Sequence, residues 1–378
     1  MTLYEILIYV SLFVFSLALG FTTSFSRYRL LILGLIAKGI FFGLFFPIEM
    51  HELFLHLVLI LALIFMIFYL AAHFRVNEFD TLSKYALKFA LKTIVLTVIV
   101  IGSIAWVLFE ENPFYTAVLV LILIGTDPQT INTSTKKIMY LERYESAFKS
   151  LVTAVLIFLL IAMGNSSTQL DLGFDKAYGM ILGVGTGLVL SLLYFNFTEN
   201  IKGVTYYFST ILFSAVVFFI SRALDGNGIL SLAVVGFLFA NLHISGRKEI
   251  RIIAKKFSRY TMLPVFVIIV FYGMVEFPQK LFDHGLIIKT LILFAVYLLI
   301  RFTAVHFSTN GLPLKFREKI YMVLNNPHGS TPALAVLYLI VYQPQSMLLA
   351  AAIIQLLVFS LLTSAVFEYI VKGEAWKK

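Results

Sequence analysis

One carboxylate stands where an apolar stretch of the sequence stops. A run of aliphatic residues leads into Gly125-Thr126-Asp127-Pro128, and polar residues follow as far as Lys137. A carboxylate beside a proline is costly inside a bilayer unless the broken backbone lines a polar cavity. Asp127 is therefore predicted to bind a cation or a proton, with main-chain carbonyl groups near Thr126 as neutral ligands. A cap for the helix that resumes after Pro128 is the alternative.

A second polar group marks the start of the next expected helix, near residue 145. Glu145 and Lys149 are four residues apart, as are Ser146 and Ser150, so each pair shares a helix face. Together they offer an acid, a base and two hydroxyl groups to the broken segment. An intrahelical ion pair between Glu145 and Lys149, near the cytoplasmic end of the helix, is the other interpretation.

One arginine lies deep within a later apolar run. Arg301 is too far from either end of the expected helix 286–307 for its charge to reach the membrane surface easily. It needs an anion, and Glu145 is the best candidate if Lys149 is engaged elsewhere. We expect the Glu145–Arg301 ion pair to be structural.

The elements that must position these residues are membrane helices. Of the 378 residues, 60% are hydrophobic and 13% charged, a balance that indicates an all-α polytopic membrane protein. Cysteine is absent, which excludes disulfides and thiolate metal sites. No metal triad or nucleophile–base pair is visible, so we expect no enzyme, no cofactor and no metal beyond a transported monovalent cation. The net charge of +9 does not indicate nucleic acid, because cytoplasmic loops are expected to be basic.

Apolar runs of spanning length predict about thirteen transmembrane helices. The expected limits are 4–21, 30–46, 53–72, 86–109, 114–139 (broken), 146–163, 177–197, 205–221, 229–243, 261–277 (interrupted), 286–307, 320–343 (broken) and 346–371. With this count, 21 of the 29 Lys and Arg residues fall on one side, 4 on the other and 4 within spans. The asymmetry predicts a cell-membrane protein with its N-terminus outside and its C-terminus in the cytoplasm.

The two broken segments indicate how the helices are organised. The second break contains Asn325-Asn326-Pro327-His328-Gly329-Ser330-Thr331-Pro332 and lies seven helices after the first. This placement predicts two inverted six-helix repeats joined by the seventh helix, as in many secondary transporters. We expect a single membrane transporter domain over 1–378, with core-site helices in 114–163 and 286–343 and no soluble regulatory domain.

Two further segments have recognisable patterns. Residues 245–260 space apolar side chains among six cations and predict an amphipathic interfacial linker, either a lipid anchor or a mechanical link. Gly179, Gly183 and Gly187 recur every fourth residue and predict a face for close helix packing.

Several motifs resemble the monovalent cation/proton antiporters of the sodium/hydrogen exchanger type. Residues 125–128 look like the family's Thr-Asp-Pro break, and residues 141–146 are similar to its Leu-Glu-Gly-Glu-Ser motif. Residues 224–230 resemble its Leu-Gly-Gly-Ser-Gly turn, and residues 263–273 its Pro-(x)-Phe-Phe…Gly segment. Arg301 falls at the family's eleventh-helix arginine, while Pro327-His328-Gly329 stands where the family has Pro-Arg-Gly.

The resemblance implies a homodimer in which a core domain, with crossed broken helices, moves against a dimerisation domain. It also implies that Glu145 pairs with Arg301, and that Thr126 and Ser146 help to hold the ion. The sequence departs from the family after the Glu-Ser motif, where Lys149-Ser150 replaces Asn-Asp or Asp-Asp. The family's usual ion-carrying aspartate is therefore missing.

A mechanism without that aspartate follows from the midplane charges. Asp127 pairs with Lys149 at rest, and an incoming sodium or potassium ion takes Asp127 with Thr126, Ser146 and Ser150 as oxygen ligands. The displaced, poorly hydrated Lys149 then releases a proton, because burial disfavours the charged form of an amine. An anion or neutral-solute transporter, and a non-transporting homologue, are the alternatives. The expected partners are a monovalent cation, protons and the lipid bilayer.

Overall fold

The described part of the protein consists of helices and their connections. The computed structural model describes residues 52–72, 81–110, 112–126, 136–164, 172–198, 203–243, 281–310, 312, 314–325, 328, 330–343 and 346–372. These residues contain no β-strand. The expected spans 4–21, 30–46 and 261–277 and the linker 245–260 lie outside them, so the count of thirteen and the inverted repeat stay predictions.

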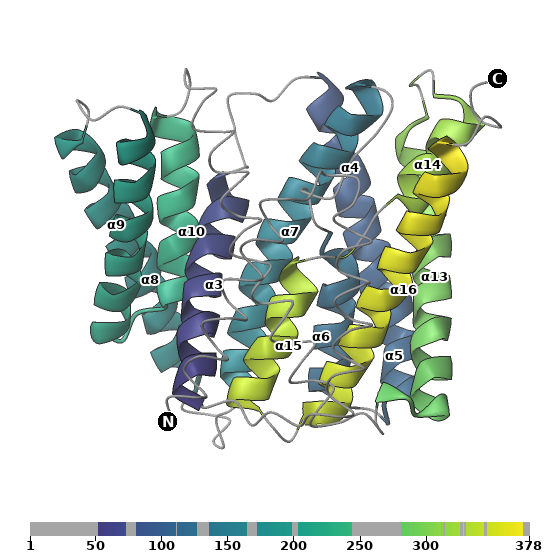
Figure 1. Cartoon of the computed structure of the whole chain (residues 1–378), viewed down its shortest axis with the longest axis horizontal. Coiled ribbons are helices and arrows are strands. Elements are labelled where there is room, and N and C mark those ends of the chain that lie inside the picture. The colour runs from purple at the N-terminus through teal and green to yellow at the C-terminus, as the bar shows by residue number, and fades with distance from the viewer. Residues whose placement is uncertain are drawn as a thin grey trace, which may run out of the picture.

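One group of helices lies on the left of Figure 1. It comprises α3 (Glu52–Ala72), α8 (Leu172–Phe197), α9 (Gly203–Ala223) and α10 (Gly228–Leu238), and the π-helical turn η4 (Phe239–His243) continues α10. Helix α10 packs against the other three. A Cβ atom on Gly183 of α8 would lie 2.4 Å from the carbonyl oxygen of Asn227, just before α10. The glycine repeat on α8 therefore packs closely against another backbone, as its spacing predicted.

A second group of helices carries the predicted site. It comprises α4 (Thr81–Leu96) with its continuation through η3 (Thr97–Ile101) and α5 (Gly102–Leu108), then α6 (Pro113–Ile124), α7 (Lys136–Gly164), α13 (His284–Ser308), α14 (Phe316–Leu324), α15 (Ser330–Tyr342) and α16 (Met347–Lys372). Helix α7 contacts α4, α6 and α15, and it also contacts α3 of the first group. Helix α15 also contacts α3, so α7 and α15 both join the second group to the first.

A helix ends at each of the two predicted breaks. Helix α6 ends at Ile124, and the backbone of the next residue, Gly125, is extended (φ −67°, ψ 128°). The second broken segment forms α14 and α15, which end and begin at Leu324 and Ser330. Figure 1 shows α14 in the upper part of the molecule and α15 in the lower part. Half-helices of this kind place polar backbone groups inside the bundle.

The start of α7 differs from the expectation. The apolar pattern predicted a helix beginning near residue 145, but α7 begins at Lys136. Its first ten residues include Lys136, Lys137 and Arg143, which interrupt the apolar run without being poor helix formers. Hydropathy locates the part of a helix within the bilayer, whereas the helix itself continues beyond it. The expected boundary was therefore wrong.

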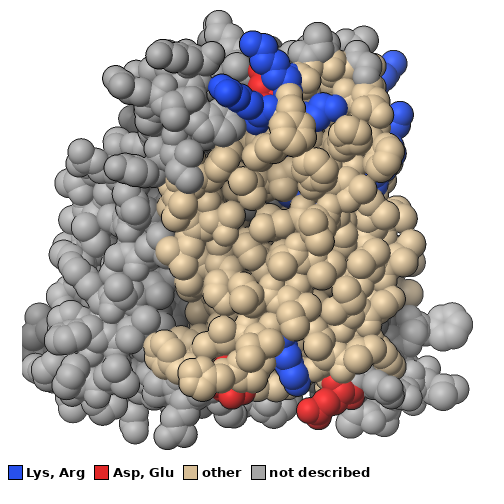
Figure 2. All heavy atoms as spheres, turned by 90° about the vertical axis from the view of Figure 1, so that its right-hand side faces the viewer, with Lys and Arg blue, Asp and Glu red and all other residues tan. Residues whose placement is uncertain are grey.

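Four helices of the described part are long and apolar enough to cross a membrane. They are Leu82–Leu108, Ala177–Phe197, His284–Ser308 and Met347–Phe367. Figure 2 shows Lys and Arg side chains gathered at the upper end of the visible face, above a broad uncharged band. The exposed cations of α4 and of the start of α14 are Lys84, Lys88, Lys315 and Arg317. This distribution supports the predicted assignment of these residues to one side of the membrane.

Candidate ion-binding site

The break after α6 collects hydroxyl groups from α7. Thr126 is buried, and its carbonyl oxygen accepts a hydrogen bond from Ser146 Oγ at 2.9 Å and another from the Ser150 hydroxyl. The Thr126 hydroxyl donates to Ser146 Oγ at 3.0 Å. Three residues predicted to hold the ion therefore lie together at the point where α6 stops. Asp127, the next residue along the chain, lies outside the described residues.

A buried charge cluster lies beside these hydroxyl groups, on the neighbouring residues of α7. Arg301 on α13 donates from Nη1 to Glu145 Oε1 at 2.8 Å and from Nη2 to Oε2 at 3.2 Å. Its Nε donates to the carbonyl oxygen of Met322 on α14 at 3.0 Å. Lys149 forms an ion pair with the same carboxylate, Glu145. Glu145 thus takes part in both of the pairs that the sequence offered as alternatives, and none of the three charged side chains is more than 1% exposed.

Two residues of this cluster were not predicted as site residues. The ring of Phe89 on α4 lies under both cations, 5.1 Å from the Arg301 guanidinium carbon and 5.9 Å from Lys149 Nζ. An aromatic face in a dry environment attracts cations. Glu142, which is 1% exposed on α7, acts electrostatically on Arg301. Phe89 gave no sequence signal because it resembles any core aromatic, while the position of Glu142 three residues before Glu145 was a usable signal.

The second break contacts the first through a histidine. His328, between α14 and α15, places ring Nδ1 at hydrogen-bond distance from the carbonyl oxygen of Gly125. The His328 main-chain N–H donates to Ser360 Oγ on α16 at 3.1 Å. Sequence analysis noted His328 within a motif but not as a site residue. Only the tertiary contact reveals it, because residues 125 and 328 are far apart in the chain.

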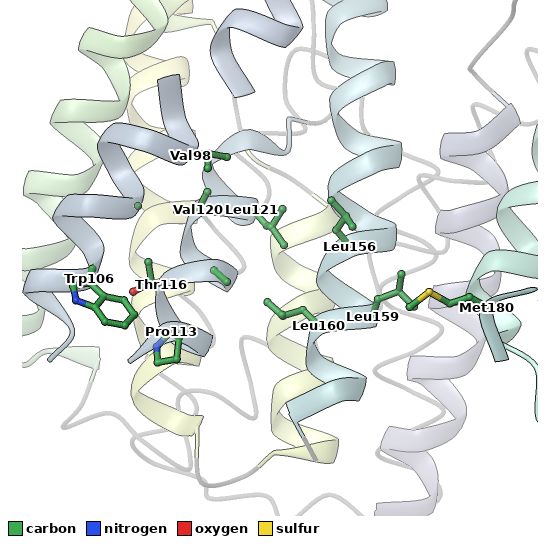
Figure 3. Close-up of a pocket in the computed structure, with 12 residues that line it drawn as sticks. Val98, Trp106, Pro113, Thr116, Val120, Leu121, Leu156, Leu159, Leu160 and Met180 are labelled. Carbon is green, nitrogen blue, oxygen red and sulfur yellow. The ribbon is translucent and has the colours of Figure 1, made fainter. Parts of the chain in front are cut away.

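An apolar cavity lies beside α6 and α7, away from these charges. Its volume is about 480 Å³, and Figure 3 shows Trp106, Thr116, Leu156 and Met180 among the side chains around it. No charged residue lines it, and Thr116 carries its only polar side chain apart from the indole N–H of Trp106. A space of this chemistry suits hydrocarbon rather than an ion. It separates part of the second helix group from Met180 on α8.

Comparison with protein families gives a match over nearly the whole chain. A sequence profile described as "Sodium/hydrogen exchanger, transmembrane" matches residues 10–372. The chain belongs to the sodium/hydrogen exchanger family. It is accordingly a multi-pass membrane transport protein, and the family is one of transporters rather than enzymes. Comparison with curated proteins gives no match.

Solved structures show the same fold. A structure of the sodium proton antiporter MjNhaP1 from Methanocaldococcus jannaschii at pH 8 has a TM-score of 0.72 and 17% sequence identity, covering 96% of this chain and 99% of that one. An electron-microscopy structure of the same antiporter has a TM-score of 0.70 and 17% identity, covering 99% of this chain and 97% of that one. The helix arrangement of this exchanger is therefore that of an antiporter of known structure.

Proposed function

We propose that this exchanger is a secondary active transporter that exchanges a monovalent cation, sodium or potassium, for protons by alternating access. Family membership supports the class of activity. The observation that carries the site is the Thr126 carbonyl group, which receives two α7 hydroxyls at the end of α6, beside buried Lys149. A hydroxyl group can donate to that carbonyl when the site is empty and turn its lone pairs towards a cation when it is filled.

The proposed cycle makes Asp127 alternate between two positive partners. At rest Asp127 forms an ion pair with Lys149. An arriving cation then binds Asp127 and displaces Lys149, with oxygens of Thr126, Ser146 and Ser150 as its other ligands. Arg301 already binds both oxygens of Glu145, so the Glu145 carboxylate neutralises Arg301 and Lys149 together and not Lys149 alone. An additional cation nearby raises the cost of a charged amine in a dry site, and Lys149 releases a proton.

The proposed movement follows the two helix groups. The group that carries the site (α4 to α7 and α13 to α16) acts as the core domain, and α3 with α8, α9 and α10 belongs to a dimerisation domain of a homodimer. The roles of Glu145 and Arg301 are structural, because they tie α7 to α13 and α14. The orientation with the N-terminus outside and the C-terminus in the cytoplasm of a cell belongs to the same proposal.

One alternative has a specific observation in its favour. Ser150 stands where the family carries its ion-binding aspartate, and the residue before it is Lys149, which is fully buried. A fixed positive charge at that place favours an anion or neutral solute over a cation. Uptake of such a solute that is insensitive to sodium and potassium would support this alternative and contradict antiport.

The test is proton flux in proteoliposomes after a pH jump, measured with sodium, with potassium and without either. Antiport predicts cation-dependent proton flux in the wild type and loss of proton coupling in Lys149→Ala. Lys92→Ala is the matched control, since Lys92 on α4 lies outside the site and donates to the carbonyl oxygen of Phe307 at 3.3 Å. Undiminished coupling in Lys149→Ala would refute the role of Lys149.

A further inference from the structure

The apolar cavity beside α6 and α7 opens on the outer surface of the bundle. Three of the side chains that line it are partly exposed, Val98 by 50%, Trp106 by 40% and Leu156 by 44%. Val98 and Trp106 belong to Leu82–Leu108, one of the helices that are long and apolar enough to cross a membrane. The medium around such a span is hydrocarbon. The opening of the cavity therefore faces acyl chains and not water.

The cavity is elongated along the helices that form it. On the continuous helix formed by α4, η3 and α5 it is lined from Val98 to Trp106, and on α6 it is lined from Pro113 to Leu121. The two residues of each pair are eight positions apart, or about 12 Å at about 1.5 Å of rise per residue. Figure 3 shows Val98 and Leu121 above Trp106 and Pro113. The long axis of the cavity therefore follows membrane helices, which is also the direction of the surrounding lipid chains.

The lower end of the cavity in Figure 3 lies where two membrane helices are connected. Trp106 comes two residues before the end of α5 at Leu108, and Pro113 is the first residue of α6. The connection contains Asn112 and the exposed Glu110. Polar residues between two spans indicate the membrane surface, where the amphipathic ring of tryptophan is also favoured. A phospholipid can thus keep its headgroup at this surface while one of its chains extends into the cavity.

The cavity also touches both helix groups. Leu159 and Leu160 on α7 belong to the group that carries the ion-binding site, and Met180 on α8 belongs to the other. Leu121 on α6 lines the cavity, and its carbonyl oxygen accepts a hydrogen bond from the N–H of Gly125 at 3.0 Å. A chain in the cavity would therefore pack against the helix that ends at the ion-binding site and against a helix of the neighbouring group.

We propose that this cavity binds one acyl chain of a membrane phospholipid, which enters laterally from the bilayer. The wall offers hydrocarbon contact along its length and no charge that would hold an ion. A lipid chain is already in hydrocarbon before it binds, so binding depends on close packing and not on the hydrophobic effect. Filling the cavity with a side chain should therefore abolish binding.

Two glycines provide a variant that fills the cavity and a matched control. Gly102 lines the cavity, and the nearest atom to a Cβ there, beyond its own helix backbone, would be Val120 Cγ2 at 3.9 Å. Gly102→Leu therefore has room and places a side chain where the acyl chain would lie. Gly185 on α8 is exposed, does not line the cavity, and has nothing within 4 Å of such a Cβ. Gly185→Leu is the control, and Ala117→Leu on α6 is a second variant that fills the cavity.

The first measurement is native mass spectrometry of the protein in detergent, with phosphatidylcholine and oleic acid added together. We expect the wild type and Gly185→Leu to retain one phosphatidylcholine more per chain than Gly102→Leu and Ala117→Leu. Retention of oleic acid in place of phosphatidylcholine would overturn the choice of a phospholipid. Equal retention of lipid by all four proteins would overturn the site.

The second measurement uses the fluorescence of Trp106. The chain has two tryptophans, Trp106 and Trp376, so the background Trp376→Phe leaves Trp106 as the only emitter. Phosphatidylcholine with brominated acyl chains quenches a tryptophan that it contacts. We expect saturable quenching at a low fraction of this lipid in detergent, both in the background and after adding Gly185→Leu.

Gly102→Leu and Ala117→Leu should leave only the gradual quenching by lipid around the protein. Saturable quenching that survives in both of these variants would refute the site. Neither measurement depends on transport, so the lipid site and the proposed antiport can fail separately. A wild type that binds the phospholipid but shows no cation-dependent proton flux would contradict antiport alone.

Discussion

Arg301 binds both carboxylate oxygens of Glu145, with N–O distances of 2.8 and 3.2 Å, across 156 residues of the chain. Its third donor, Nε, bonds the carbonyl oxygen of Met322. One guanidinium therefore joins α7, α13 and α14, and it does so beside the second break. The planar fork of arginine makes this arrangement possible, because a lysine ammonium cannot bind a carboxylate in the same bidentate manner.

Removing the shared carboxylate should be strongly destabilising. Glu145→Gln leaves two buried cations, Arg301 and Lys149, without their common partner, and we expect a loss of roughly 3–5 kcal/mol in the free energy of unfolding. Arg301→Lys keeps the positive charge and should lower the free energy of unfolding by less. Denaturation in detergent measures the free energy of unfolding of both variants. Glu110→Gln is the exposed control, and we expect its free energy of unfolding to change by less than about 0.5 kcal/mol. A wild-type stability for Glu145→Gln would contradict the structural role of the pair.

The end of α6 should not tolerate a side chain. In Gly125→Ala the new Cβ atom would lie 2.9 Å from Thr153 Oγ1, so α6 must move away from α7. We expect weaker sodium-dependent proton flux, because the Thr126–Ser146 contact depends on this approach. Adding Thr153→Ala removes the clashing oxygen and should restore flux. If the double variant is no better than the single one, steric contact with Thr153 is not the cause.

Two neighbouring glycines on α8 offer a matched comparison. A Cβ atom on Gly183 would meet the backbone of Asn227 at 2.4 Å, whereas one on Gly185 would have nothing within 4 Å. Backbone cannot yield as a flexible side chain does, so Gly183→Ala should cost roughly 1–3 kcal/mol of stability. Gly185→Ala should be neutral or stabilising by up to about 1 kcal/mol, because alanine favours helix. Equal thermal stability of the two variants would show that the packing of α8 against α10 is loose.

A carboxylate at position 150 should make the stability of the site depend on a bound cation. The Ser150 hydroxyl donates to the Thr126 carbonyl oxygen, and an ionised aspartate cannot donate. Two facing acceptors repel unless a cation lies between them, so sodium should raise the thermal stability of Ser150→Asp more than that of the wild type. Ser150→Asn, which adds no charge, is the control.

Flux measurements on the same variant address the mechanism. Exchange is expected in the wild type as well as in Ser150→Asp. Sodium-dependent proton flux that is present in Ser150→Asp and absent from the wild type would show that Lys149 cannot substitute for the missing aspartate. That result would favour a transporter of another solute or a non-transporting homologue.

The apolar runs and their interruptions contain most of the information about the helices. Hydropathy identified both broken segments, because proline and polar residues in the middle of an apolar run are costly unless the helix stops there. It misplaced the start of α7, because helix propensity and not hydropathy decides how far a helix extends into water. The glycine repeat on α8 also identified its own packing face, since a period of four residues returns to one side of a helix.

What the sequence determined by itself was therefore local: the helices among the described residues, the places where α6 and α14 end, and the shared helix face of Glu145 and Lys149. Tertiary structure decided which groups meet across the chain. It gave Glu145 two partners, placed Phe89 under both cations, and brought His328 to the Gly125 carbonyl. The physical reason is that periodicity specifies the face on which a residue lies, whereas the identity of the opposite residue depends on how separate helices pack.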